Sequence, residues 1–115
     1  MQKEYKLSII TVNYNGIKDT CELIDSIPFN NNMEVIVVDN ASLENEASLI
    51  AKRYPYVKTI RTTKNLGFAG GNNIGIKAAM GKYLFLINND TIFKDFCIQT
   101  LIDRLESSSN IAIVC

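Results

Sequence analysis

Short, continuously apolar runs alternate along this chain with segments whose apolar residues recur every three or four positions. The run KLSIITV leads into Asn-Tyr-Asn-Gly, which predicts a buried strand followed by a loop. Apolar residues from Ile17 to Ile27 recur at helical spacing and predict a helix, which Pro28 ends. The chain therefore opens with a strand and a helix.

The same alternation continues through the middle of the chain. Residues 35–38 and 56–61 predict a second and a third strand. Between them, Ser42 is expected to cap the N-terminus of a second helix, which Pro55 ends. One face of that helix is expected to pack inward and carries Leu43, Ala47, Ile50 and Tyr54.

The next segment is richer in glycine. Residues 62–73 predict a glycine-rich loop, and residues 73–80 predict a helix of small residues with Ile74 and Ala78 facing inward. The run KYLFLI, residues 82–87, predicts a fourth strand.

The C-terminal segment predicts one more helix and the start of a strand. Asp95 precedes a helix whose apolar side is expected to carry Ile98, Leu101, Ile102 and Leu105. Residues 111–115, IAIVC, are apolar and rich in β-branched residues, and predict a fifth strand. Because that strand stops at the last residue, we expect the 115 residues to be the front part of a longer polypeptide.

Continuously apolar strands that alternate with amphipathic helices are typical of an α/β fold. We predict a single Rossmann-like domain over residues 1–115, with a mostly parallel sheet and helices on both faces. The length is sufficient for one hydrophobic core.

The composition excludes several classes of function. Lysine and arginine together number 12, as do aspartate and glutamate, so no net charge attracts nucleic acid or an anionic membrane. The chain has no histidine, which excludes triads built on that residue and removes the commonest general base. Any chemistry must rely on carboxylates, amides and backbone groups.

The cysteines and the polar start of the chain indicate a reducing compartment. Cys21, Cys97 and Cys115 are far apart and lie in apolar patterns, so we expect buried free thiols. The N-terminal residues MQKEYK are too polar for a signal peptide, and no apolar run approaches the roughly 20 residues needed to span a bilayer. We expect a cytoplasmic protein.

Polar clusters follow three of the predicted strands at their carboxyl ends. They are NYN at 13–15, DN at 39–40 and NND at 88–90, and the glycine-rich stretch opens a helix at the same edge. Each cluster alone has a structural explanation, as a turn, a cap or a place of close helix–sheet packing. Ligands of open α/β sheets bind beyond the carboxyl ends of the strands, so the joint placement predicts a nucleotide site.

The kind of nucleotide site is narrowed by missing motifs and by one carboxylate. Neither the dinucleotide-binding fingerprint nor the P-loop is present. Asp90, next to two amides, suits Mg²⁺ or Mn²⁺, a cation that keeps some waters and takes further ligands from a diphosphate. Asp90 is the candidate metal ligand.

Four segments, in their order along the chain, resemble glycosyltransferase family 2. They are SIITVNYNG, EVIVVDNAS, NLGFAGGNNIGI and YLFLINNDT, and the resemblance covers about residues 7–115. It implies a GT-A fold and an inverting transfer from a UDP, dTDP or GDP sugar to a saccharide or lipid-linked acceptor. The chain looks particularly like the branch that transfers rhamnose and related sugars in bacterial polysaccharide synthesis, in some cases at the cytoplasmic face of the membrane.

The resemblance also implies a set of donor-site residues. Tyr14 would stack on the base, Asp39 and Asn40 would contact the base or ribose, and residues 71–73 would lie beside the ribose and diphosphate. Asp90 matches the family's final metal-binding aspartate. The complete donor-binding set that it implies is Val12, Asn13, Tyr14, Asp39, Asn40, Gly71, Asn72, Asn73 and Asn88.

Two residues depart from the family's common pattern. Asn88 stands at an acidic position and Asn72 at a common arginine, so the diphosphate charge would be compensated by a metal, Lys64, Lys77 or helix N-terminal amides. The resemblance identifies no general base among the 115 residues. We expect the base to lie beyond them, and the chain to bind the donor poorly or partially and not to turn it over on its own.

Two other functions stay open. A noncatalytic nucleotide-binding or interaction module would share the fold, although a receiver-like module needs acidic residues where the first strand ends in amides. A nucleotidyltransferase would normally carry a glycine-rich and basic loop after the first strand, where this chain has NYNGIKD. An exposed sheet edge is also expected to allow self-association.

Overall fold

The computed structural model describes residues 5–93 and 97–107 of the chain. Four strands form one parallel sheet in the order β3-β2-β1-β4. The strands are β1 (Tyr5–Asn13), β2 (Met33–Asp39), β3 (Lys58–Arg61) and β4 (Gly81–Leu86). Asn13 and Asp39, the last residues of β1 and β2, lie side by side in the register. The two polar clusters therefore meet at one edge of the sheet.

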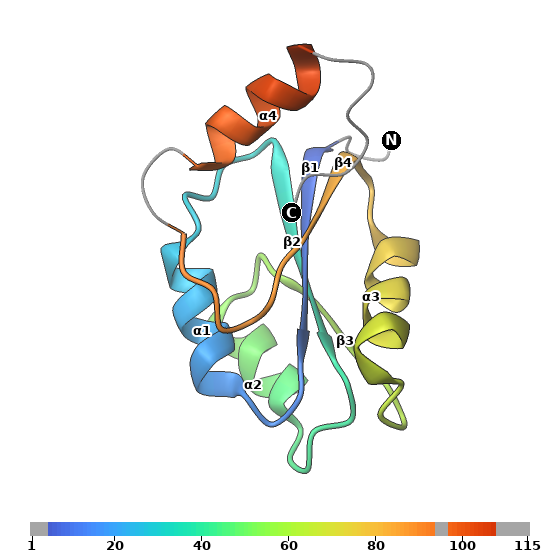
Figure 1. Cartoon of the computed structure of the whole chain (residues 1–115). Helices are drawn as coiled ribbons and strands as arrows, with labels where there is room; N and C mark the ends of the chain where they lie inside the picture. The colour runs from blue at the N-terminus through green and yellow to red at the C-terminus, as the bar shows by residue number, and fades with distance from the viewer. Residues whose placement is uncertain (1–4, 94–96, 108–115) are drawn as a thin grey trace.

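Helices cover both faces of the sheet, which confirms the α/β prediction (Figure 1). They are α1 (Ile17–Ser26), α2 (Glu46–Arg53), α3 (Gly67–Ala78) and α4 (Cys97–Ser107). Helices α1 and α2 lie on one face and connect β1 to β2 and β2 to β3, whereas α3 lies on the other face and returns the chain to β4. The strand order thus reverses on either side of β1, at the switch point where ligands bind in such sheets.

Alternate residues of the central strands pack against opposite layers. Ile9 and Val37 belong to the core cluster under α1 and α2, whereas Ile10 and Val38 pack with α3. Every residue of β2 is buried. Because both faces of the sheet are covered, the strands read as continuous apolar runs, which is the pattern that made them predictable.

Helix α3 begins earlier than the sequence predicted. The prediction placed a loop over 62–73 and a helix over 73–80, but the helix starts at Gly67 and ends at Ala78. Glycines lower helix propensity, so the pattern favoured a loop. They are tolerated because α3 approaches the sheet closely: a Cβ on Gly75 would lie 2.4 Å from Cγ2 of Ile10. The packing role considered for residues 65–73 is confirmed at Gly71, where a Cβ would lie 3.0 Å from Cγ1 of Val12.

This close approach predicts that Gly75→Ala destabilises the protein. Alanine favours a helix by about 1 kcal/mol over glycine, whereas forcing a methyl group into a packed core costs about 1–3 kcal/mol. We expect the free energy of unfolding, measured by urea denaturation, to fall by about 1 kcal/mol. Exposed Lys77→Ala on the same helix is the control, and a stabilising Gly75→Ala would contradict the packing account.

The start of α2 also differs from the prediction. Its N-cap is Asn45, whose Oδ1 accepts a hydrogen bond from Ser48 N at 3.1 Å, and Ser42 does not cap the helix. The Ser42 hydroxyl instead bonds to other side chains at the rim of the sheet. Leu43, which lies before the helix, is 91% exposed and does not share the inward face. The expected burial of Ala47, Ile50 and Tyr54 is confirmed.

Helix α4 lies near the end of the sheet where the strands begin (Figure 1). Lys6 Nζ of β1 and Glu106 Oε1 of α4 form an ion pair of 2.6 Å, and Ile102 is buried as predicted. Cys21 is a buried free thiol, as predicted. No helix within the described ranges is long and apolar enough to span a bilayer. Several predictions fall on parts of the chain that the structure does not describe. They concern Asp95, Cys115 and the strand at 111–115, and the side chains of Cys97, Ile98, Leu101 and Leu105.

Candidate functional site

A cleft of about 360 Å³ opens at the carboxyl ends of β1, β2 and β4, beside the start of α3. It is lined by Val12, Tyr14, Asn40, Asn65, Gly67, Phe68, Asn88, Asn89 and Asp90. Five of these residues were singled out from the sequence: Val12, Tyr14, Asn40, Asn88 and Asp90. The fold therefore brings the ends of three strands to one concave site, at the topological switch point.

The amide of Asn40 is occupied by the backbone at the start of α3. Its Oδ1 accepts hydrogen bonds from Leu66 N at 2.8 Å and Thr62 Oγ1 at 3.2 Å. Its Nδ2 donates to Gly67 O at 2.9 Å, and the residue is only 2% exposed. Asn40 lines the cleft, but its hydrogen-bonding groups fasten the end of β2 to the first turn of α3.

Asn13 and Asp39 lie behind the cleft, on the face of the sheet that α1 and α2 cover. Both are 0% exposed, and Asn13 Nδ2 donates to Asp39 Oδ1 at 3.2 Å and to Glu46 Oε1 at 2.9 Å. Asp39 Oδ1 also accepts from the Ser42 hydroxyl, and Asp39 Oδ2 accepts from Ala47 N at 3.3 Å. The structure thus ties these two side chains to each other and to the start of α2, away from the cleft lining.

Two more amides hold the loops around the cleft. Asn15 N donates to Ser42 Oγ at 2.8 Å, and Asn15 Oδ1 accepts from Leu43 N at 2.8 Å. On the other side, Asn89 Nδ2 donates to Thr20 Oγ1 at 3.1 Å. The loop that carries Tyr14 is therefore braced against the loop after β2, and the loop after β4 is braced against α1.

The residues predicted at 71–73 lie on α3 and do not line the cleft. A Cβ on Gly71 would lie 3.0 Å from Cγ1 of Val12, so this residue seats α3 against β1. Asn72 is 6% exposed, and Asn73 is exposed to solvent.

The polar side chains left free in the cleft are few. Within the described ranges, the side chains of Tyr14, Asn88 and Asp90 form no hydrogen bond or ion pair and are exposed. Asn65 keeps only its Nδ2 free, because its Oδ1 accepts from Gly67 N at 2.8 Å. The cleft thus offers ligands one carboxylate, a phenol and amides.

This set of groups fits a cation that is shared with a ligand. Among the described residues, no three acidic, cysteine or histidine side chains are grouped to hold a metal by themselves. Asp90 and the amide oxygen of Asn88 are hard donors of the kind Mg²⁺ and Mn²⁺ take, and such ions keep waters and phosphate oxygens as their other ligands.

Two residues of the cleft lining, Asn65 and Phe68, were not singled out from the sequence, because their stretch was interpreted as a loop ahead of the helix.

Ala41, between Asn40 and Ser42, has a left-handed backbone with φ of 62°. Its two neighbours form hydrogen bonds on opposite faces of the sheet. Asn40 bonds to the start of α3, and Ser42 bonds to Asp39 on the face that α1 and α2 cover. A left-handed conformation costs about 1 kcal/mol in a residue that carries a Cβ.

Ala41→Gly should therefore stabilise the protein. Relief of the strain favours glycine, and its larger entropy in the unfolded chain offsets part of the gain, so we expect an increase of about 0.5–1 kcal/mol in the free energy of unfolding. Ala51→Gly, within α2, is the matched control and should destabilise by about 1 kcal/mol. Urea denaturation of both variants provides the test, and equal losses of stability would contradict strain at Ala41.

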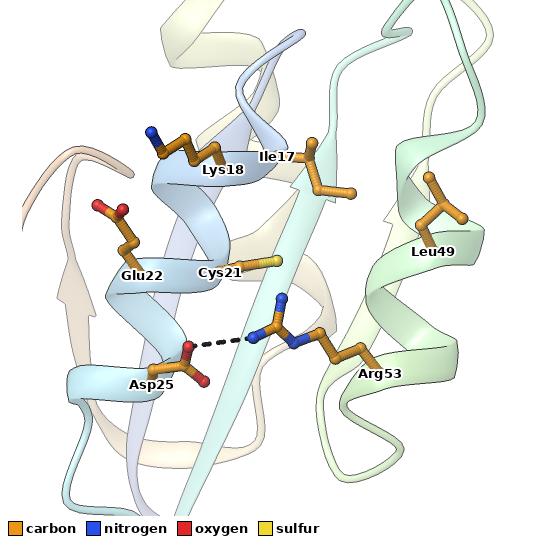
Figure 2. A pocket seen from close by; sticks show the side chains of 7 residues that line it. All are labelled: Ile17, Lys18, Cys21, Glu22, Asp25, Leu49 and Arg53. Carbon is orange, nitrogen blue, oxygen red and sulfur yellow. Dashed lines mark hydrogen bonds and ion pairs between the residues drawn. The ribbon is translucent and has the colours of Figure 1, made fainter.

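A larger groove of about 600 Å³ lies between α1 and α2 (Figure 2). Asp25 and Arg53 approach each other across it, with Oδ2 and NH2 3.4 Å apart. Tyr54 OH donates to Asp25 Oδ1 at 2.7 Å, and burial together with this bond raises the pKa of Tyr54 above its usual value. The groove shares no lining residue with the cleft, and none of the polar residues that follow β1, β2 and β4 lines it, so we assign the ligand site to the smaller cleft.

Comparison with known proteins identifies the family. The family model described as glycosyl transferase family 2 matches residues 8–115. The chain belongs to glycosyltransferase family 2. The family resemblance recognised in the sequence is confirmed.

Similar proteins from several organisms carry glycosyltransferase names. An uncharacterized glycosyltransferase of Rickettsia conorii, RC0461, is 32% identical over 90% of this chain and 18% of its own length. The Bacillus subtilis glycosyltransferase YwdF, also uncharacterized, is 32% identical over 90% of this chain and 39% of its own length. A dolichol-phosphate mannosyltransferase of Pyrococcus furiosus is 32% identical over 94% of this chain and 32% of its own length. This family 2 chain therefore spans well under half of these relatives.

A solved structure confirms the fold. Residues 1–349 of Staphylococcus aureus TarS, in a crystal structure with UDP, superpose with a TM-score of 0.77 at 24% identity, over 89% of this chain and 32% of that 1–349 chain. The parallel sheet of this family 2 chain is thus the Rossmann-like core of the GT-A fold, as expected.

Proposed function

We propose that this chain is the donor-binding part of a glycosyltransferase that transfers a sugar from a nucleoside diphosphate. One observation carries the proposal: in the cleft, Tyr14, Asn88 and Asp90 are free, while the other amides of the rim are used to hold it together. Family membership and the UDP complex of TarS support the same ligand class.

We assign two parts of the ligand to different free groups of the cleft. We assign the base to the side of Val12 and Tyr14, because an exposed phenol ring is a stacking surface. We assign the diphosphate to Asn88 and Asp90, at the end of β4.

The residues outside the lining receive supporting roles. In this assignment Asn13, Asp39 and Asn40 position the rim, and Gly71 seats α3 against β1. Asn72 and Asn73 remain proposed neighbours of the ribose and diphosphate.

Asp90 would hold a Mg²⁺ or Mn²⁺ ion, with Asn88 beside it. Such an ion supplies Lewis-acid stabilisation of the negative charge on a departing diphosphate. The chain's own part is to present one carboxylate at the end of β4 and to fix the loop behind it through Asn89. No lysine or arginine lines the cleft among the described residues, so the cation held by Asp90 would compensate the negative charge of the diphosphate.

We place the remaining parts of the reaction outside these 115 residues. An inverting transfer needs a general base that deprotonates the acceptor hydroxyl, and Asp90, the cleft's carboxylate among the described residues, is assigned to the metal. The proposal also places the general base and the acceptor site in that further part of the protein. It includes a rhamnosyltransferase-like specificity for a bacterial polysaccharide or lipid-linked acceptor, and a cytoplasmic location. It further states that this chain alone does not turn over.

Calorimetric titration tests the proposal directly. The chain is titrated with UDP, dTDP and GDP, each with and without Mn²⁺. We expect metal-dependent binding of one nucleotide in preference to the others. Binding of no nucleotide would contradict the assignment and favour a noncatalytic interaction module.

A further inference from the structure

Phe68 presents an exposed aromatic ring to the cleft from the first turn of α3. Its exposed fraction is 62%, and Tyr14, which lines the same cleft from the end of β1, is 52% exposed. Large aromatic side chains usually bury most of their surface, so two accessible rings in one concave site call for an explanation. Accessible rings of this kind are typical of sites that stack on nucleic-acid bases.

Hydrogen bonds hold the backbone immediately before Phe68. Asn40 bonds to both Leu66 N and Gly67 O, immediately before Phe68. Gly67 has a φ of 77°, a conformation that suits glycine, and its N–H donates to Asn65 Oδ1. These contacts fix the turn without any ligand.

The distance between this turn and β1 is set by Gly71. One turn after Phe68, it lies so close to Val12 that a Cβ there would be 3.0 Å from Cγ1. Packing therefore places the backbone at Phe68 relative to the end of β1 in the free protein. Such preorganisation lowers the entropy lost on binding.

We propose that Phe68 contacts the base of the donor nucleotide and forms, with Tyr14, the aromatic part of the base subsite. The inference rests on the proposed function and adds to it a ligand-contacting residue on α3. We assign both rings, which belong to the end of β1 and the start of α3, to the base, and the free carboxylate Asp90, in the loop after β4, to the diphosphate. Asn40 then acts as a positioning residue for the Phe68 turn.

A tryptophan at this position would report on the base. The chain contains no tryptophan, so Phe68→Trp introduces a single indole emission. We expect UDP with Mg²⁺ to quench or shift that emission, and pyrophosphate with Mg²⁺, which lacks a base, to leave it unchanged. Phe29→Trp is the matched control, because Phe29 is also partly exposed but packs on Tyr56 outside the cleft.

Affinity provides the second measurement. Phe68→Ala should weaken binding of UDP on the order of ten-fold and leave the affinity for pyrophosphate unchanged, because loss of one stacking ring costs about that much. Phe68→Tyr should restore UDP binding. The thermal midpoint of each variant, measured in parallel, should stay close to that of the wild type because the ring is exposed.

The outcomes separate this inference from the proposed function. If the wild type binds UDP but Phe68→Ala binds it equally well, the role of Phe68 is overturned and the donor site stands. Equal quenching of Phe68→Trp by pyrophosphate would also overturn the contact with the base. If the wild type binds no nucleotide, the proposed function and this inference fall together.

Discussion

Asp90→Ala should lose metal-dependent nucleotide binding by about 100-fold, the largest effect on binding that we expect. Asp90 is the free carboxylate in the cleft lining, and within the described residues no acidic neighbours are grouped with it to take over a cation. At an effective dielectric constant of about 20, unit charges 4 Å apart interact by about 4 kcal/mol. In the variant, water that takes the place of the carboxylate restores part of this interaction energy. Calorimetric titration with UDP and Mn²⁺ measures the loss.

Two further variants make this result specific. Asp19→Ala removes an exposed carboxylate from the first turn of α1 and should bind like the wild type. Asn88→Asp adds a second carboxylate beside Asp90 and should tighten the metal-dependent binding. An Asp90→Ala protein that keeps its dependence on Mn²⁺ would place the cation elsewhere.

Asp39→Ala should lower the free energy of unfolding by about 3 kcal/mol, the largest effect on stability that we expect. The carboxylate is 0% exposed and accepts hydrogen bonds from Asn13, Ser42 and Ala47 N. Its removal leaves these donors without their acceptor in a buried place and opens a cavity. Urea denaturation measures the change.

A surface carboxylate is the matched comparison. Glu106→Ala removes an ion pair with Lys6 whose side chains are 38% and 44% exposed, and should lower the free energy of unfolding far less than Asp39→Ala does. The same measurement also distinguishes two roles for Asp39. If Asp39→Ala were as stable as the wild type but bound nucleotide much more weakly, Asp39 would contact the donor directly, as the family resemblance implies.

The strands could be predicted because burial on both faces leaves a simple record in the sequence. The strands predicted at 35–38 and 82–87 were recognisable from apolar runs alone, and the polar residues after them mark the rim of the sheet. The start of α3 was not predictable in this way. Gly67, Gly71 and Gly75 lower helix propensity; the close contact with β1 explains Gly71 and Gly75, and a φ of 77° explains Gly67.

The candidate site was predictable in position more than in detail. Amides follow β1, β2 and β4, and an amide that holds a loop looks the same in the sequence as one that binds a ligand. Asn40 and Asn88 illustrate the difference, since the first is bonded to the turn before α3 and the second is free. Only the positions of the neighbouring backbone groups decide between these roles. Phe68 could have been suspected from an aromatic residue inside a glycine-rich stretch.

Paramagnetic broadening by Mn²⁺ in the presence of UDP would locate the bound ligand on the protein. Amide signals of the isotope-labelled chain are compared with Mg²⁺ and Mn²⁺ in the presence of UDP. We predict that Mn²⁺ broadens the signals of residues 88–91, and more weakly those of Tyr14 and Phe68, around the cleft. Broadening centred instead on Cys21 and Leu49, in the groove between α1 and α2, would contradict the account.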